Sequence, residues 1–228
     1  MENAVRVLST LALMGAVRRL AGRYQAAAGV RIDADFAPTL ALLDRLRRGE
    51  GADVVILTRQ ALDDLAAQGA VAADSCVDLA RPYVGIAVRS GAAHPDIATE
   101  SALRATLLGA RVVAYSRLGA SGIFFAQLIE RMGIASAINA RACIVPQGFT
   151  AERLVTGEAE LAVQQLSELK QVKGIEVVGP IPLDLQSPAV FSAGRLAASK
   201  RVVQSDALLK YLASPEVAPA LHESGLEP

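Results

Sequence analysis

A run of four small residues, Gly119-Ala120-Ser121-Gly122, follows an apolar segment and leads directly into an amphipathic one. This pattern predicts a strand, a tight turn and the first turn of a helix. Backbone N–H groups in a first helical turn have no partner inside the helix, and the aligned peptide dipoles make that end partly positive. Small side chains let a ligand approach the backbone closely. The turn is therefore a candidate anion site, in which the Ser121 hydroxyl either contacts the anion or caps the helix.

The elements that would position this turn alternate regularly along the chain. Hydrophobic periodicity predicts strands followed by helices from the start to the end of the sequence. Strands are expected near 5–8, 30–36, 53–57, 83–88, 112–115, 143–145, 161–163, 175–178 and 189–191, and helices near 11–28, 38–49, 62–69, 102–108, 120–132 and 150–155, with further helices at the end. Thr150 is the expected N-cap of the helix through Leu154, and Ser214-Pro215 is a good cap and first-turn pair.

Alternating units of this kind predict an α/β fold with parallel sheets and helices on both faces, in which ligands bind beyond the carboxyl ends of the strands. Several of these ends carry hydroxyls, amides or glycines. They are Ser9-Thr10, Thr39, the segment from Ser116 to Gly122, the segment Gln147-Gly148-Phe149-Thr150, and Gln164-Gln165. Donors from separate strand ends can converge on one small anion, which a single helix end holds too weakly, at about 0.3–1 kcal/mol when exposed.

Composition excludes several classes of function. The 228 residues contain 23 Lys and Arg and 23 Asp and Glu, so the formal net charge is zero, and neither nucleic acid nor an anionic membrane is an expected partner. Cys76 and Cys143 are far apart and lack a metal-ligand motif, and His94 and His222 are the only histidines. We therefore expect no metal, and the absence of phosphate-loop and dinucleotide-binding motifs predicts no cofactor.

The uncharged segment 7–17 is too short to span a bilayer, and no small-residue cleavage site follows it. The chain as written is therefore expected in the cytoplasm without membrane insertion. It would be periplasmic if a leader had been removed, and a transporter permease would be a partner only if the chain were exported.

Four segments carry a family resemblance. They are VRVLSTLALMGAVRRLAGRYQAAAGVRIDADFAPT, RGEGADVVILTRQALDDLAAQGAV, GASGIFFAQLIERMGI and SPAVFSAGR. In order and spacing the chain resembles the molybdate-binding branch of the type II periplasmic binding proteins. The resemblance implies two Rossmann-like lobes joined by two crossover strands and closing over a small ligand. Lobe 1 would comprise 1–80 and 190–228, and lobe 2 would comprise 81–189.

The same resemblance implies which residues contact the ligand. The helix-start loop of the family is kept as Ala120-Ser121-Gly122, the first-loop serine falls near Ala12 just after Ser9 and Thr10, and the family tyrosine is replaced by Gln164 or, most simply, Gln165. Arg81 and Arg117 could supply a carboxylate-binding fork. The resulting candidate ligand residues are Ser9, Thr10, Thr39, Arg81, Ser116, Ser121, Gly122, Gly148, Phe149 and Gln165.

Two functions remain open at this point. The first is a protein that binds a small anion, either an oxyanion such as molybdate or a small carboxylate. The second is an isomerase of small tricarboxylates on the same scaffold, since some similar sequences isomerise aconitate. Proton transfer next to a carboxylate needs a base, for which Glu168, His94 and Tyr115 are candidates only because they lie near the loops; Glu168 is expected to make a surface contact. The sequence assigns no catalytic residue.

Overall fold

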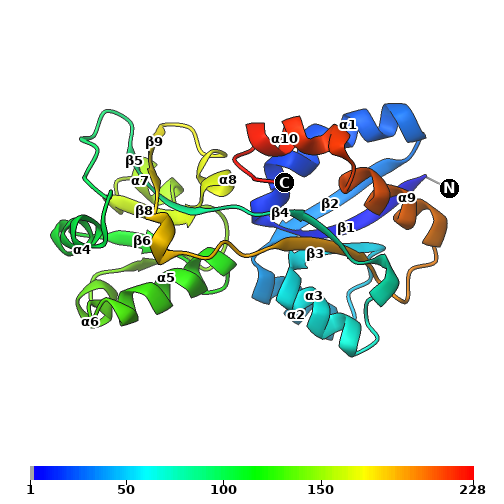
Figure 1. Cartoon of the computed structure of the whole chain (residues 1–228), viewed down its shortest axis with the longest axis horizontal. Helices are drawn as coiled ribbons and strands as arrows, with labels where there is room; N and C mark the ends of the chain where they lie inside the picture. Colours follow the sequence, from blue (N-terminus) through cyan, green and yellow to red (C-terminus); the bar gives the residue numbers. More distant parts are fainter. Residues whose placement is uncertain (1–2) are drawn as a thin grey trace. The chain divides into compact units, whose positions relative to one another are not determined.

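The computed structural model describes residues 3–228, and the chain divides into two compact units. Unit 1 comprises Met1–Pro82 and Ala189–Pro228, and unit 2 comprises Tyr83–Pro188. Each unit is built around a five-stranded sheet with helices on both faces (Figure 1). These two α/β units agree with the two-lobe architecture that the family resemblance implies. None of the helices in residues 3–228 combines the length and apolar character needed to cross a bilayer.

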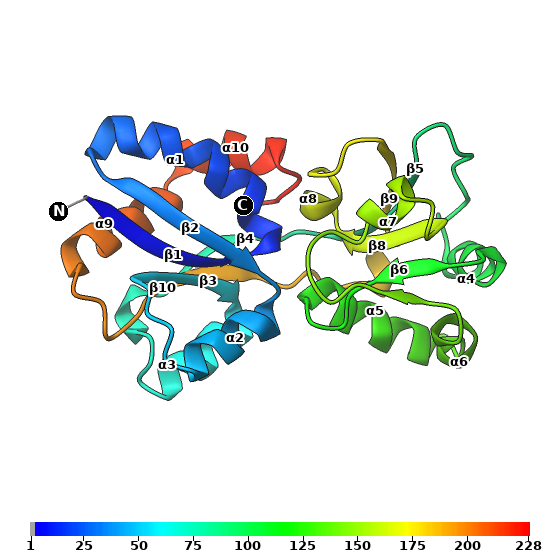
Figure 2. The same ribbon diagram turned by 180° about the vertical axis from the view of Figure 1, so that it is seen from behind.

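Unit 1 has the strand order β2-β1-β3-β10-β4. Helices α1 and α10 lie on one face of its sheet, and α2 and α3 lie on the other (Figure 2). The elements are β1 (Ala4–Thr10), η1 (Leu11–Leu13), α1 (Met14–Ala28), β2 (Arg31–Ala37), α2 (Thr39–Arg47), β3 (Val54–Thr58), α3 (Arg59–Ala67), η2 (Ala73–Ser75), β4 (Val77–Ala80), β10 (Phe191–Arg195), α9 (Val202–Leu212), η4 (Pro215–Val217) and α10 (Ala218–Glu223).

Unit 2 has the strand order β7-β6-β8-β5-β9. Helices α5 and α6 lie on one face of its sheet, and α7 and α8 lie on the other (Figures 1 and 2). The elements are β5 (Val84–Arg89), α4 (Glu100–Gly109), β6 (Val113–Tyr115), α5 (Ala120–Arg131), α6 (Ala135–Asn139), β7 (Cys143–Ile144), α7 (Glu152–Val155), β8 (Leu161–Gln165), α8 (Leu166–Leu169), β9 (Ile175–Pro180) and η3 (Leu183–Leu185).

The expectation of wholly parallel sheets is wrong, because both sheets are mixed. Strand β10 pairs antiparallel with β3 and β4, and β5 pairs antiparallel with β8 and β9. Each of β5 and β10 comes directly after the chain passes from one unit to the other, at Pro82–Tyr83 and at Pro188–Ala189. These strands therefore do not follow a helical crossover, which is what returns a chain to the amino end of a parallel sheet.

The apolar interior of unit 2 has two layers, one on each side of its sheet. Phe125, Leu128 and Leu103 are fully buried in the layer under α4, α5 and α6, whereas Leu154 and Leu169 are fully buried in the layer under α7 and α8. Burial of side chains of this size contributes about 1.5–3 kcal/mol each relative to exposure. Apolar side chains thus cover both faces of the sheet, and the loops leave it at the strand ends.

One glycine sets the position of α5 against the end of β6. A Cβ atom on Gly122 would lie 1.5 Å from the backbone oxygen of Ser116. No side-chain movement can relieve this contact because the obstacle is backbone. Gly122 therefore lets the first turn of α5 pack directly on the loop that leaves β6, in the manner of the glycine that allows close helix–strand packing in nucleotide-binding turns.

We expect Gly122→Ala to lower the free energy of unfolding by roughly 1–3 kcal/mol or more, since overpacking against backbone forces α5 away from β6. Gly22→Ala is the matched control, because Gly22 lies inside α1 with nothing within 4 Å of the added Cβ. The control should raise stability by about 0.5–1 kcal/mol through helix propensity. Urea denaturation of both variants measures these changes, and equal effects would contradict the packing argument.

Candidate active site

The carboxyl ends of three neighbouring parallel strands lie at one edge of the unit 2 sheet. Ala114 of β6 is in register with Ala162 of β8, and Tyr115 of β6 is in register with Ile144 of β7. Adjacent strands are about 4.8 Å apart. The loops that follow β6, β7 and β8 therefore leave the sheet side by side, and we call this border of unit 2 the polar edge.

The first component of the polar edge is the loop from Ser116 to the start of α5. The Ser116 hydroxyl accepts a hydrogen bond from the N–H of Leu118 at 3.2 Å, which shapes the turn. Gly119 is the N-cap of α5 and gives no side-chain cap. The N–H of Gly122 donates to the oxygen of Gly119 at 3.1 Å. The hydrogen bonds found within residues 3–228 leave the N–H groups of Ala120 and Ser121 unpaired.

Ser121 adds a hydroxyl to these two N–H groups. Its side chain is 3% exposed, and the hydrogen bonds within the described chain include none from its hydroxyl. This hydroxyl is not among the fully buried, unpartnered side-chain atoms of residues 3–228, so it is open to water or to a ligand. The turn opens α5, as its small residues predict, and the anion site at this helix start stays a prediction.

Gln164, at the end of β8, joins the other two loops of the polar edge. Its side-chain oxygen accepts hydrogen bonds from the N–H and the hydroxyl of Thr150, at 2.8 and 3.0 Å. Its side-chain nitrogen donates to the oxygen of Gly148 at 3.3 Å and also hydrogen-bonds to the carboxyl of Glu168. These bonds use the amide within the protein, so Gln164, which the resemblance offers as a ligand residue, instead positions the two loops.

The prediction that Thr150 caps a helix is wrong. Helix α7 starts at Glu152, its N-cap is Ala151, and no side-chain cap is present. Thr150 is fully buried and its hydroxyl lies against Gln164 and the oxygen of Val163 instead. The hydroxyl is thus bonded to a buried amide and does not face the first turn of α7. Gly148, which precedes Phe149 in the same loop, has φ 80°, a conformation that favours glycine.

Glu168 is the most unusual group of the polar edge. It is 7% exposed, so the expectation of a surface contact is wrong. Gln165 is the N-cap of α8, and its backbone N–H donates to the Glu168 carboxyl, which is half of a capping box. The salt bridges within residues 3–228 include none with Glu168. Desolvation raises the pKa of Glu168 to about 8, although the hydrogen bonds from Gln165 and Gln164 lower it.

The turn between β8 and α8 is held against β5 by close packing. The N–H of Leu166 donates to the oxygen of Tyr83 at 2.8 Å. A Cβ on Gly85 would lie 2.3 Å from a methyl carbon of Leu166 and 2.7 Å from the backbone oxygen of Gly179. Glycine at position 85 thus lets Leu166 lie directly on β5. This contact fixes the start of α8, and with it the position of Glu168 three residues after the strand.

The other two base candidates from the sequence are placed differently. Tyr115 is fully buried, and its hydroxyl hydrogen-bonds to the side-chain oxygen of Asn139. Arg117 also lies there, 3.3 Å from that oxygen and with its guanidinium over the Tyr115 ring. His94 is exposed and lies 2.9 Å from Glu176. Tyr115 is therefore bonded to Asn139 and His94 is exposed, whereas Glu168 is a buried carboxyl at the polar edge.

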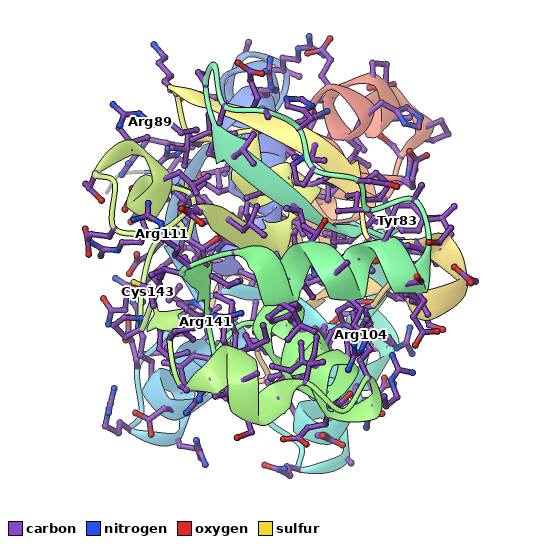
Figure 3. All side chains as sticks on the ribbon, turned by 90° about the vertical axis from the view of Figure 1, so that its left-hand side faces the viewer. Tyr83, Arg89, Arg104, Arg111, Arg141 and Cys143 are labelled. Atoms are coloured by element: carbon purple, nitrogen blue, oxygen red, sulfur yellow. The ribbon has the colours of Figure 1, made fainter. Side chains whose placement is uncertain are left out.

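His94 belongs to the opposite edge of the unit 2 sheet, because its partner Glu176 is in register with Val88 near the end of β5. A cavity of about 590 Å³ lies on that side, lined by Arg89, Thr106, Arg111 and Glu160 among others. Figure 3 shows Arg89 and Arg111 on one side of the unit, away from Tyr83, which precedes β5. Arg111 is paired with Glu160 there. This cavity is separate from the polar edge.

Unit 1 carries its own hydroxyls at strand ends. Ser9 is fully buried at the end of β1 and donates to the oxygen of Thr10 at 3.1 Å. The Thr10 hydroxyl caps η1 by accepting from the N–H of Ala12 at 3.1 Å. Thr39 is buried as the first residue of α2. Arg81 is exposed after β4, with its backbone bridged to Glu227. These contacts account for local structure in unit 1.

Comparisons with known proteins agree with this architecture. A family model described as bacterial extracellular solute-binding protein matches residues 5–227. One relative, an aconitate isomerase from a Pseudomonas species, is 41% identical over 232 residues, which cover 99% of this chain and 88% of the relative.

Solved structures with the same fold are more distant in sequence. The periplasmic molybdate-binding protein of Azotobacter vinelandii has a TM-score of 0.83 at 15% identity, covering 98% of this chain and 99% of that one. The sulfate-binding protein of Mycobacterium tuberculosis has a TM-score of 0.78 at 15% identity, covering 100% of this chain and 87% of that one.

The buried carboxyl predicts a specific dependence of stability on pH. Because the pKa of Glu168 rises from 4.5 to about 8 on folding, the folded state binds this proton more tightly. The corresponding stability is full below the unfolded pKa and is lost as the pH rises through the folded pKa. Glu168→Gln imitates the neutral acid, so its free energy of unfolding should fall less than that of the wild type between about pH 5 and 8.

Urea denaturation across this range measures the difference. Glu130→Gln, which changes an exposed glutamate on α5, is the control and should follow the wild type. Parallel curves for the wild type and Glu168→Gln would show that the carboxyl is solvated.

Proposed function

Because the chain belongs to the family of bacterial extracellular solute-binding proteins, we propose that it binds a small polycarboxylate and isomerises it, with aconitate as the substrate. The observation that carries this proposal is the buried carboxyl of Glu168, which has no ion-pair partner among residues 3–228, at the same edge as the anion-attracting start of α5. The relative of 41% identity supports the choice of substrate, since its name is aconitate isomerase and the match covers 99% of this chain.

The start of α5 suits a carboxylate of the substrate. Two unpaired N–H groups, at Ala120 and Ser121, and the Ser121 hydroxyl supply three donors for two carboxylate oxygens. Hydrogen bonds to a charged acceptor contribute about 1.5–3 kcal/mol each, so they matter more than the helix dipole alone. We also retain Ser9, Thr10, Thr39, Arg81, Ser116, Gly122, Gly148, Phe149 and Gln165 as proposed ligand residues.

A second candidate function is binding of an oxyanion such as molybdate without any reaction. It is favoured by the Ala120 and Ser121 donors, which suit any small anion. In this case the further partner would be a transporter permease. The polar edge argues for the carboxylate instead, because an oxometallate has no use for a titratable carboxyl beside its site, whereas proton transfer in a carboxylic acid needs one.

Ligand screening separates the two functions. In a thermal-shift assay, cis-aconitate, trans-aconitate and citrate should raise the melting temperature, since a ligand of the folded state stabilises it. Proton NMR of protein mixed with either aconitate isomer should show conversion into the other. A shift with molybdate alone, together with unchanged aconitate spectra, would replace the isomerase proposal by oxyanion binding.

The role of the α5 start is tested by Ala120→Pro, which removes one N–H from the first helical position, where proline fits and where Gly119 before it is already extended. Loss of this donor should raise the Kd for aconitate by about tenfold or more. Glu100→Pro makes the same change at the first position of α4, after the extended Thr99, and should leave the Kd unchanged. Equal Kd values for both variants would remove the α5 start from the site.

A further inference from the structure

The proposed reaction requires a group that moves a proton. In aconitate a methylene group is flanked by a carboxylate and by the carbon–carbon double bond. Removal of one methylene proton places the electron pair in an allylic system shared with the carboxylates. Return of a proton to the other end of this system shifts the double bond and allows the other geometry. Atoms and charge balance without an oxidant or a co-reactant, so one base that takes and returns the proton is sufficient.

We infer that Glu168 is this catalytic base, an assignment that rests on the proposed function. Its carboxylate would take the methylene proton of the bound polycarboxylate, so that the C–H bond breaks and an O–H bond forms on Glu168. The same carboxylic acid would then return the proton to the far carbon of the allylic system. The Ala120 and Ser121 N–H groups would donate hydrogen bonds to the substrate carboxylate and so stabilise the negative charge that develops on it during the first step.

Position supports this role. Glu168 is tied to the end of β8 by the N–H of Gln165 and the amide of Gln164, and β8 is the direct neighbour of β6, from which the α5 loop emerges. Helix α5 also packs against β8. The carboxyl and the anion donors therefore follow adjacent parallel strands of one sheet.

Rigidity supports it as well. Gln164 is fixed through Thr150, and the α8 turn is fixed through Leu166 on β5. Two groups thus hold the carboxyl without supplying a positive charge. Burial without a neighbouring cation disfavours the charged carboxylate of Glu168, in agreement with its raised pKa. The carboxylate is therefore a stronger base than that of an exposed glutamate.

A purely structural role for Glu168 makes a different prediction. As the third residue after the N-cap Gln165, a glutamate that only closes a capping box can be replaced by glutamine, which accepts the same hydrogen bond. A base cannot be replaced in this way, because a neutral amide does not take a proton from carbon. Glu168→Gln therefore distinguishes the two roles without removing the cap.

The experiment compares wild type, Glu168→Gln and Glu130→Gln in two assays. The first is the turnover of cis-aconitate by proton NMR, and the second is the Kd of propane-1,2,3-tricarboxylate, the saturated analogue, by calorimetry. We expect Glu168→Gln to lose at least about 100-fold in kcat, the usual contribution of a general base, while its Kd for the analogue stays within about threefold of wild type. Glu130→Gln should match wild type in both assays.

The outcomes separate the inference from the function on which it rests. Wild-type turnover that persists in Glu168→Gln would overturn the assignment of the base and leave the isomerase function intact. A wild type that binds the analogue but never converts aconitate would overturn both. If Glu168→Gln lost kcat and analogue affinity together, the carboxyl would be a binding group and the inference would fail. Glu168→Asp, which keeps an acid on a shorter side chain, should recover part of the lost kcat.

Discussion

The side-chain amide of Gln164 is the contact on which the polar edge of unit 2 depends. It is 2% exposed, and it connects Thr150 and Gly148 after β7 with Glu168 after β8. A buried amide is costly unless its donors and acceptors are satisfied, and here both ends are used. The network therefore stabilises one arrangement of two loops and leaves Glu168 without freedom to turn towards solvent.

This arrangement explains why a helix start alone is not the centre of the site. Helix α5 brings two N–H groups and a hydroxyl, but these donors only attract charge. Glu168 adds a carboxyl whose burial favours the neutral form, which is the property that the proposed proton transfer uses. In the proposed function, the start of α5 supplies recognition of the anion and the buried acid on the neighbouring strand supplies reactivity. The solved structures at 15% identity share the scaffold, and the 41% identical relative shares it together with an enzymatic name.

Much of the fold was predictable from the sequence because it follows from local patterns. The two-lobe α/β architecture is confirmed, and the turn 119–122 opens α5 as its small residues indicate. The strand directions of β5 and β10 were not predictable from alternation, since they depend on where the chain passes between the units. Glu168 was misplaced for a similar reason: a charged residue is ordinarily exposed, and its burial in α8 depends on tertiary packing that no local pattern shows. The ligand residues remain predictions, because no local pattern shows which loops contact a ligand.

Gly85, on which Leu166 at the start of α8 packs, restricts which substitutions this protein can accept. A side chain at position 85 meets two obstacles of different kinds, the flexible end of Leu166 and the rigid carbonyl of Gly179. Shortening residue 166 would clear the first and leave the second, so no compensating exchange is open at this position. At Gly194 the near atoms all belong to the side chains of Val71, Leu62 and Cys76, which can trade volume with it. Over evolutionary time, position 194 can therefore drift together with its neighbours, while position 85 stays fixed in every descendant that keeps the α8 turn.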